Sequence, residues 1–250
     1  MISIVIPTYH RKKSLLRLLK SLDRKNEIIV VEQGENNKKT YKKYIDNYVF
    51  LQKPSTPHAM NIGVKNAKED LVLFLDDDVT VTKNFWKYHE KNFKDTRVAA
   101  TVGRVITDGQ PIEPERMDTG SVDWIGSFSD GFSSTIRQEV DTVIGANTCW
   151  SKDVFLALGG FDERFCGNAL RFESDLSLRA KKAGYKIIFE PKALVYHRRE
   201  ATGGARKTEG RIRWYIDYFK NELLFFVKHR PVYLFPIFIV KKMLWVITNL

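Results

Sequence analysis

Cysteine is scarce in this sequence, which has two, Cys149 and Cys166, among 250 residues. Two cysteines in a chain of this length do not form the disulfide framework of a small secreted domain, so we expect a reducing compartment. Internal repeats and low-complexity segments are also absent from the sequence. The apolar run near the N-terminus, residues 2–8, is too short for a signal peptide, and its basic residues follow it.

The sequence also lacks a long, unbroken hydrophobic run. Residues 231–250 are mostly apolar, but Lys241 and Lys242 interrupt them, whereas a spanning helix needs roughly 20 consecutive apolar residues. We therefore expect this tail to lie on a membrane surface, with its lysines at the lipid headgroups. A helix packed on the rest of the protein is the alternative, and a true span requires that the natural chain continue past Leu250.

Acidic residues are outnumbered, with 30 Asp and Glu against 41 Lys and Arg, a net charge of +11. This balance suits nucleic acid, an anionic membrane or phosphorylated substrates. Basic residues interleave with aromatics only in the C-terminal region, and a phosphate backbone would be repelled by the acids at 76–78. We expect no nucleic-acid partner, although a non-catalytic protein that binds nucleic acid or membrane is one alternative.

The first half of the chain alternates strand and helix patterns. Apolar runs at 2–8, 27–34 and 71–75 are separated by helical patterns near 15–22 and 61–67, which predicts an α/β fold with a mostly parallel sheet covered by helices. Ligands bind at the carboxyl ends of such strands. Polar clusters follow all three runs, and we expect them to share one crevice. In the later half, the sequence predicts strands at 98–106, 186–191 and 193–197 and helices at 153–158 and 172–183. Residues 108–138 are expected to be irregular, and the segment 143–151 follows them.

Three consecutive acids, Asp76, Asp77 and Asp78, end the third apolar run. Like charges this close repel and raise each other's pKa, so a cation is expected to compensate them. Mn²⁺ or Mg²⁺ bound by one or two carboxylates and a substrate diphosphate fits this pattern; an acidic turn at a helix N-terminus is the alternative. His197 ends a later strand and suits either a third Mn²⁺ ligand or a proton donor to phosphate.

A carboxylate and an ion pair lie in the stretch 171–179, on the helix predicted over residues 172–183. Glu173 lies on the apolar face with Leu176, which predicts a raised proton affinity and a general base. Asp175 and Arg179 are four residues apart on the other side and are expected to pair; Asp175 is the fallback base. Arg206 follows two glycines, and this loop either folds over phosphates or is solvated.

Six segments resemble, in order, the motifs of family 2 glycosyltransferases with the GT-A fold, and the resemblance covers about residues 1–200. The segments are IVIPTYHR, HAMNIGVKNA, LVLFLDDD, GGFDERF, ESDLSLRAKKAGYKI and PKALVYH. The resemblance implies inverting transfer from a nucleotide-diphosphate sugar with a divalent metal.

The resemblance also implies roles for individual residues. Asp78 would bind the metal, Asp76 and Asp77 would face the ribose and donor sugar, and Glu173 would be the base. The residues implied at the nucleotide sugar also include Pro7, Thr8, Tyr9, Arg11, Glu32, Asn61 and Gly63. The sequence departs from the family at Glu32-Gln33, where Asp-Asp or Asp-Asn is commoner, at Met60, where Arg is common, and in the base motif Phe-Glu-Ser-Asp.

The expected organisation is a GT-A domain over residues 1–200, with a nucleotide-sugar half at 1–110 and an acceptor and catalytic half at 111–200. Residues 201–250 form a basic, aromatic, amphipathic helical segment. We expect a UDP- or dTDP-sugar donor and a glycan or lipid-linked acceptor, bound near Trp124 and Trp150. The expected location is the cytoplasmic face of the cell membrane, in the synthesis of a cell-surface glycan.

The rival enzyme class is a sugar-phosphate nucleotidyltransferase. It would need a glycine- and basic-rich phosphate loop after its first strand, and PTYHRKKS has no glycine.

A thermal-shift panel separates these classes. With Mn²⁺ present, we expect at least one of UDP-, GDP-, dTDP- and CMP-linked sugars to raise the melting temperature, because bound ligand stabilises the folded state. No shift with any of them would contradict the glycosyltransferase prediction.

Overall fold

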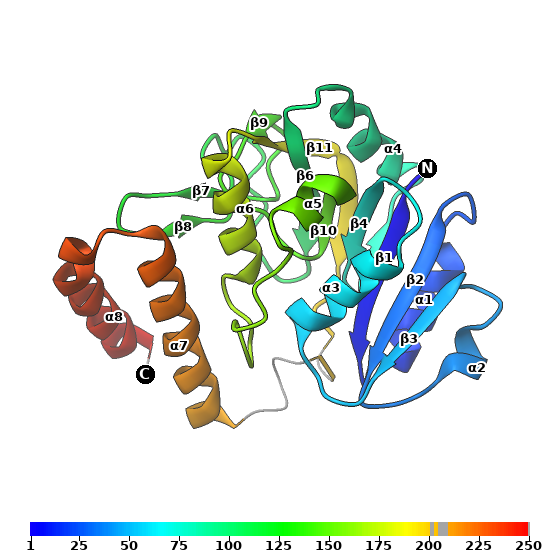
Figure 1. The fold of residues 1–250 in the computed structure, drawn as a ribbon, viewed down its shortest axis with the longest axis horizontal. Helices are drawn as coiled ribbons and strands as arrows, with labels where there is room; N and C mark the ends of the chain where they lie inside the picture. Colours follow the sequence, from blue (N-terminus) through cyan, green and yellow to red (C-terminus); the bar gives the residue numbers. More distant parts are fainter. Residues whose placement is uncertain (201–202, 205–209, 250) are drawn as a thin grey trace.

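The computed structural model describes residues 1–200, 203–204 and 210–249, and its centre is a nine-stranded sheet (Figure 1). The strand order is β3-β2-β1-β4-β10-β6-β11-β5, and β9 pairs with β11 outside this path. The strands β1, β2, β3 and β4 are mutually parallel where they pair, whereas β10 runs antiparallel to both β4 and β6. The strand bounds are β1 Ser3–Tyr9, β2 Glu27–Gln33, β3 Asn47–Leu51, β4 Leu71–Leu75, β5 Val79–Val81, β6 Val98–Thr107, β9 Gln138–Glu139, β10 Asn147–Ser151 and β11 Lys186–His197.

Helices cover both faces of the sheet (Figure 1). A short hairpin of β7 (Ser121–Val122) and β8 (Phe128–Ser129) stands apart from it. The helix bounds are α1 Lys12–Ser21, α2 Lys38–Tyr41, α3 Thr56–Asn66, α4 Phe85–Glu90, η1 Lys91–Lys94, α5 Lys152–Ala157, α6 Phe172–Lys182, α7 Arg211–His229, η3 Val232–Leu234 and α8 Phe235–Asn249.

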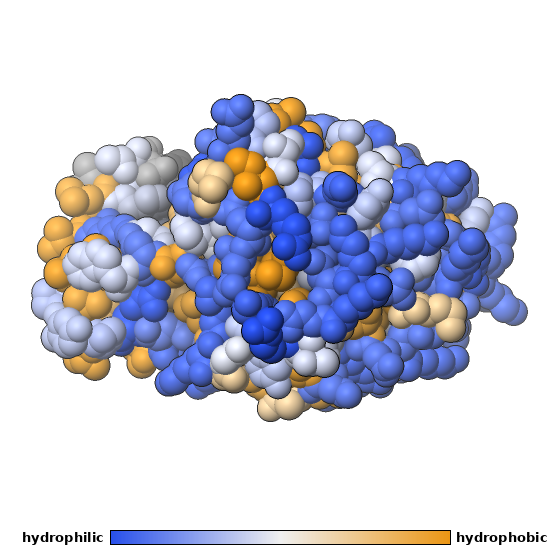
Figure 2. All heavy atoms as spheres, turned by 90° about the horizontal axis from the view of Figure 1, so that it is seen from above, coloured by the Kyte–Doolittle hydropathy of each residue, from blue (hydrophilic) through white to orange (hydrophobic). Residues whose placement is uncertain are grey.

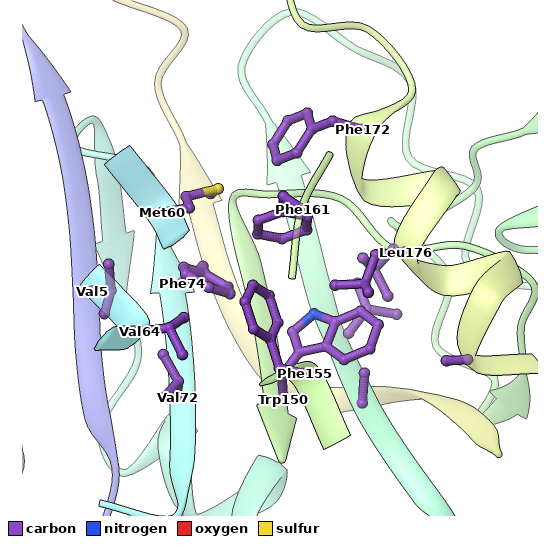
Figure 3. Packing of buried hydrophobic residues seen from close by; sticks show 14 of the residues in the cluster. Val5, Met60, Val64, Val72, Phe74, Trp150, Phe155, Phe161, Phe172 and Leu176 are labelled. Atoms are coloured by element: carbon purple, nitrogen blue, oxygen red, sulfur yellow. The ribbon is translucent and has the colours of Figure 1, made fainter. Parts of the chain in front are cut away.

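The alternating side chains of the central strands build two hydrophobic cores. On β4, Val72 and Phe74 belong to one core, and Leu73 and Leu75 belong to the other, because successive side chains point to opposite faces of a sheet. The first core packs α3, α5 and α6 against the sheet, with Trp150, Phe155 and Phe161 at its centre (Figure 3). Both faces are therefore buried, as a mostly parallel sheet requires.

The predicted parallel sheet flanked by helices is confirmed, with differences in detail. The two strands expected at 186–191 and 193–197 are one strand, β11, with a register shift between Glu190 and Leu194. Several elements were not predicted, among them β3, β5 and α4, and the stretch expected to be irregular, 108–138, contains the short strands β7, β8 and β9. Cys149 and Cys166 are both free, so no disulfide joins them.

The C-terminal helices lie at one end of the molecule (Figure 1, left). Helix α7 packs against α6, and Lys228 of α7 forms a 2.6 Å ion pair with the α6 residue Asp175. The segment expected to begin at residue 201 is therefore joined to the sheet domain by its first helix. Within the described residues, no helix combines the length and apolar character needed to cross a membrane.

Gly63, expected at the nucleotide sugar, serves close packing between α3 and β1. A Cβ at this position would lie 2.2 Å from Cγ1 of Val5, which is fully buried. We expect Gly63→Ala to lower the free energy of unfolding by about 1–2 kcal/mol, because overpacking a buried contact outweighs the gain in helix propensity.

Urea unfolding measures this change. The matched control is Gly210→Ala, because a Cβ there meets nothing within 4 Å. Equal stabilities of the two variants would show that the contact with Val5 relaxes without cost.

Candidate functional site

The polar ends of β1 and β4 meet in a cluster of opposite charges. Oγ1 of Thr8 donates a 2.6 Å hydrogen bond to Oδ2 of Asp77. Nη1 of Arg11 donates to Oδ1 of Asp77 at 3.0 Å and to Oδ2 of Asp78 at 2.9 Å. The backbone N–H of Glu200, which follows β11, also donates to Oδ2 of Asp78 at 3.0 Å. The ends of β1, β4 and β11 thus converge on one site, as the sequence predicts for β1 and β4.

Asp77 was expected to face the donor sugar, but in this structure its side chain points toward Thr8 and Arg11. Its side chain is 5 % exposed, and both of its oxygens accept hydrogen bonds from Thr8 or Arg11. Burial is the largest influence and raises the pKa of Asp77 to about 7, although Arg11 and Thr8 act in the opposite direction. Asp77 therefore holds the strand ends together in this structure.

Asp76, Asp78 and His197 form a group that fits a divalent metal ion. One ligand atom from each lies within 4.8 Å of the others, and Nε2 of His197 is 3.1 Å from Oδ1 of Asp78. Oδ1 of Asp78 is buried. Burial alone would raise the pKa of Asp78, but His197 and Arg11 lower it below its usual value. Two carboxylates and an imidazole suit Mn²⁺ or Mg²⁺.

A cavity of about 150 Å³ connects this group with the predicted base. Glu173, Asp76 and His197 all line it. The backbone at Gly145 approaches the base closely, since a Cβ there would lie 2.9 Å from Oε1 of Glu173. The remaining wall is largely apolar and comprises Thr56, Met60, Ile144, Ala146, Asn168, Ala169 and Phe172.

Asp175 does not line this cavity but forms buried ion pairs with neighbouring basic residues. Its side chain is fully buried and pairs with Arg179 at 2.8 Å, with Lys228 at 2.6 Å and with His229 at 2.8 Å. Burial would raise the pKa of Asp175, but hydrogen bonds from His229 and Lys228 and the charge of Arg179 lower it. The predicted pair with Arg179 is confirmed. The expectation that Glu173 is on the buried face and Asp175 is not was wrong, because α7 covers the second face.

Several residues expected at the nucleotide bind other parts of the protein. The carboxylate of Glu32 is buried and accepts hydrogen bonds from Tyr48, Tyr41 and two nitrogens of Asn37. Asn61 bonds both backbone groups of Phe161 and so fixes the turn before α6. In this structure neither side chain faces the cavity.

The other expected positions lie near the charge cluster or outside the described residues. Pro7 and Tyr9 lie among the last three residues of β1. The backbone N–H of Gly204 donates a 2.9 Å hydrogen bond to the carbonyl oxygen of Tyr9. Arg206 lies outside the described residues. Of the two tryptophans near which the acceptor was expected, Trp150 is completely buried in the first core (Figure 3), whereas Trp124 is exposed.

Sequence patterns did not reveal the contribution of α7 to this site. Asn221 donates a 2.9 Å hydrogen bond to Oδ1 of Asn168, a residue that lines the cavity. Glu222 pairs with Arg171, two residues before the predicted base. The available signal was two acids, Asp217 and Glu222, within residues 211–250, which otherwise carry seven basic residues.

Comparison with known proteins identifies similar sequences. The sequence model of the family described as "Glycosyl transferase family 2" matches residues 3–156. Poly-beta-1,6-N-acetyl-D-glucosamine synthase of Staphylococcus aureus is 28 % identical over 200 residues, covering 76 % of this chain and 47 % of the synthase. Pre-mycofactocin glycosyltransferase of Mycobacterium tuberculosis is 28 % identical over 207 residues, covering 78 % and 42 %. The chain thus spans about half the length of these relatives.

Solved structures are similar in fold. The structure of GalNAc-T7 with UDP, GalNAc and Mn²⁺ aligns with a TM-score of 0.67 and 20 % identity over 79 % of this chain and 44 % of that one. The mannosyltransferase PcManGT of Pyrobaculum calidifontis, in complex with GDP-Man and Mn²⁺, aligns with a TM-score of 0.60 and 15 % identity, over 91 % and 63 %. These similarities confirm the GT-A fold predicted from the sequence.

The hydrogen bond from Thr8 to Asp77 gives a direct test of the charge cluster. We expect Thr8→Val to lower the free energy of unfolding by about 1–3 kcal/mol at pH 8, because it leaves a buried carboxylate oxygen without its donor. Thr8→Ser retains the hydroxyl and should lose less. Urea unfolding measures both, and equal stability of the two variants would contradict the assigned role of Thr8.

Proposed function

Because this chain belongs to glycosyl transferase family 2, we propose that it transfers a sugar from a nucleotide-diphosphate sugar to a hydroxyl group, with inversion at the anomeric carbon. One observation carries the proposal. Glu173 and two members of the metal-binding group, Asp76 and His197, line the same cavity. A base and a site for a diphosphate-bound cation therefore face one small space, as a single displacement requires.

The residues have distinct roles in the proposed reaction. The carboxylate of Glu173 accepts the proton of the acceptor hydroxyl while that oxygen forms a bond to the anomeric carbon. The bond between this carbon and the diphosphate oxygen breaks, and its electron pair leaves with the diphosphate. Attack opposite the leaving group inverts the anomeric centre, through an oxocarbenium-like transition state.

Asp76, Asp78 and His197 would hold the Mn²⁺ or Mg²⁺ ion. When bound, such an ion supplies positive charge that stabilises the departing diphosphate. Arg11 pairs with Asp77 and Asp78, so this guanidinium fixes the carboxylates on which ion binding depends.

The proposed donor is a UDP- or dTDP-sugar, and the proposed acceptor is a glycan or a lipid-linked glycan. The relative named as a poly-beta-1,6-N-acetyl-D-glucosamine synthase supports a glycan acceptor. The similar structures hold UDP in one case and GDP-Man in the other, which is in keeping with a nucleotide-diphosphate donor. The proposed place of action is the cytoplasmic face of the membrane, where a growing cell-surface glycan would meet its donor.

Replacement of the base tests the reaction. We expect Glu173→Gln to lower kcat by roughly 10²–10⁴-fold, because the amide cannot accept the proton. Mn²⁺-dependent nucleotide binding should remain, since the metal-binding group is on other elements. Glu163→Gln, on the turn before α6, is the matched control. An active Glu173→Gln enzyme together with a folded but inactive Asp175→Asn variant would transfer the role to Asp175.

A membrane surface is the proposed partner of α7 and α8. Ile212, Ile216, Leu223 and Val227 are exposed at spacings of four, seven and four residues, which is one face of α7. Exposed side chains on α8 and the preceding turn extend this apolar face at the end of the molecule (Figure 2, left). They are Val232, Tyr233, Phe235, Ile237, Val240, Met243 and Leu244.

Charge favours an anionic bilayer as the occupant of this face. Residues 211–250 contain seven Lys and Arg and two acids, a formal charge of +5. Both acids, Asp217 and Glu222, pair with basic residues of the same helices, Arg213 and Lys242, and the net charge of these residues remains positive. An apolar helical face with basic residues beside it binds the interface of anionic membranes.

Vesicle flotation tests this partner. We expect the protein to float with phosphatidylglycerol vesicles and to float less with phosphatidylcholine alone. Leu223→Glu with Met243→Glu should reduce flotation, whereas Ile112→Glu, a similarly exposed residue outside the two helices, should not. Loss of a dimer in the double variant, with unchanged flotation, would show instead that a second copy of the chain covers this face.

A further inference from the structure

Helix α7 contacts the chain on both sides of the predicted base. Before Glu173, Glu222 pairs with Arg171 at 2.8 Å. After it, Lys228 and His229 pair with Asp175 at 2.6 and 2.8 Å. Glu222 and Asp175 are almost completely buried, so these pairs are shielded from solvent and hold their geometry better than surface ion pairs do.

Arg171 stands in a backbone conformation that its neighbours must support. Its φ of +79° lies in the left-handed region, which residues with a Cβ adopt only at an energetic cost. Two nitrogens of its guanidinium bind Oε1 of Glu222, and the group lies 3.5 Å from the centre of the Phe128 ring. Because Arg171 is the N-cap residue of α6, its conformation sets the direction in which the helix carrying Glu173 begins.

A further part of the cavity wall is also bound by α7. Asn221 bonds the backbone N–H and carbonyl of Cys166 and the side chain of Asn168. Asn168 lines the same cavity as Glu173. The chain before and after Glu173, at residues 166–168, 171 and 175, is therefore bound by a single helix, α7.

Glu222 also connects α8 to this arrangement. Nζ of Lys242 lies 2.7 Å from Oε2 of Glu222, so the carboxylate joins Arg171 on one oxygen and Lys242 on the other. The two C-terminal helices thereby form one network with the start of α6.

We infer that α7 is the positioning element for the catalytic base, with Glu222 as its principal positioning residue. This inference rests on the proposed function. Glu222 touches no part of the cavity and acts through Arg171, whose backbone orients the first turn of α6. A displacement of about 1 Å in a reacting group costs roughly 10²-fold in rate, so loss of this support should lower kcat more than it affects donor binding.

The experiment compares Glu222→Ala with two further variants in the full chain. Release of the nucleoside diphosphate is measured with whichever UDP-, GDP- or dTDP-linked sugar the wild type turns over. We expect Glu222→Ala to lower kcat about 10–100-fold, as expected for loss of a supporting partner, with the donor KM within about twofold. Glu222→Gln should recover part of kcat, because its amide oxygen still accepts from Arg171.

Phe226→Ala is the matched control, because Phe226 is buried on the same helix but packs against Leu234 and Phe238. It should retain kcat. If Glu222→Ala does not fold, Arg171→Lys tests the same contact, since lysine keeps the charge and loses the two-nitrogen interaction.

The possible outcomes distinguish a failure of the positioning role from a failure of the proposed function. An active wild type whose kcat is unchanged by Glu222→Ala, or is lowered equally by Phe226→Ala, overturns the positioning role and leaves the proposed function standing. A rise in KM with constant kcat also overturns it, because that pattern indicates donor binding. A wild type that transfers no sugar from any donor overturns the proposed function and this inference with it.

Discussion

The guanidinium of Arg11 holds two adjacent carboxylates, and the site depends on this interaction. Asp77 and Asp78 follow a buried strand, where two unpaired charges would be strongly unfavourable. Arg11 binds one oxygen of each, and Thr8 and the N–H of Glu200 satisfy two further positions. The ends of β1 and β4 and the chain after β11 are joined at this point, which fixes the metal-binding group relative to the sheet.

This constraint divides the acidic run into separate roles. Asp77 points into the charge cluster and stabilises it, whereas Asp76, at 37 % exposure, remains at the cavity with Asp78 and His197 beside it. Glu173 reaches the cavity from α6 on another part of the fold. In the proposed reaction, metal binding and proton transfer use different carboxylates. The sheet positions the first, and we infer that α7 positions the second.

The sequence predicted what local patterns determine and missed what distant packing determines. The apolar run at 71–75, the acids after it and His197 were sufficient to expect a metal-binding strand end. The orientation of Asp77 was missed, because it depends on Arg11, 66 residues earlier. The burial of Asp175 was missed because α7, more than 50 residues later, covers it. The hydrogen bonds from Tyr41 and Tyr48 to Glu32 were likewise not foreseen, because they depend on how the fold packs these residues together.

Anomalous diffraction from crystals grown with Mn²⁺ and UDP tests the central claim most directly. We expect one strong peak within coordination distance of Asp78 and His197, on the side of Asp76, with Asp77 still bound to Arg11 and Thr8. A peak coordinated by Asp77, or full occupancy of Mn²⁺ away from His197, would contradict the division of the acidic run described above.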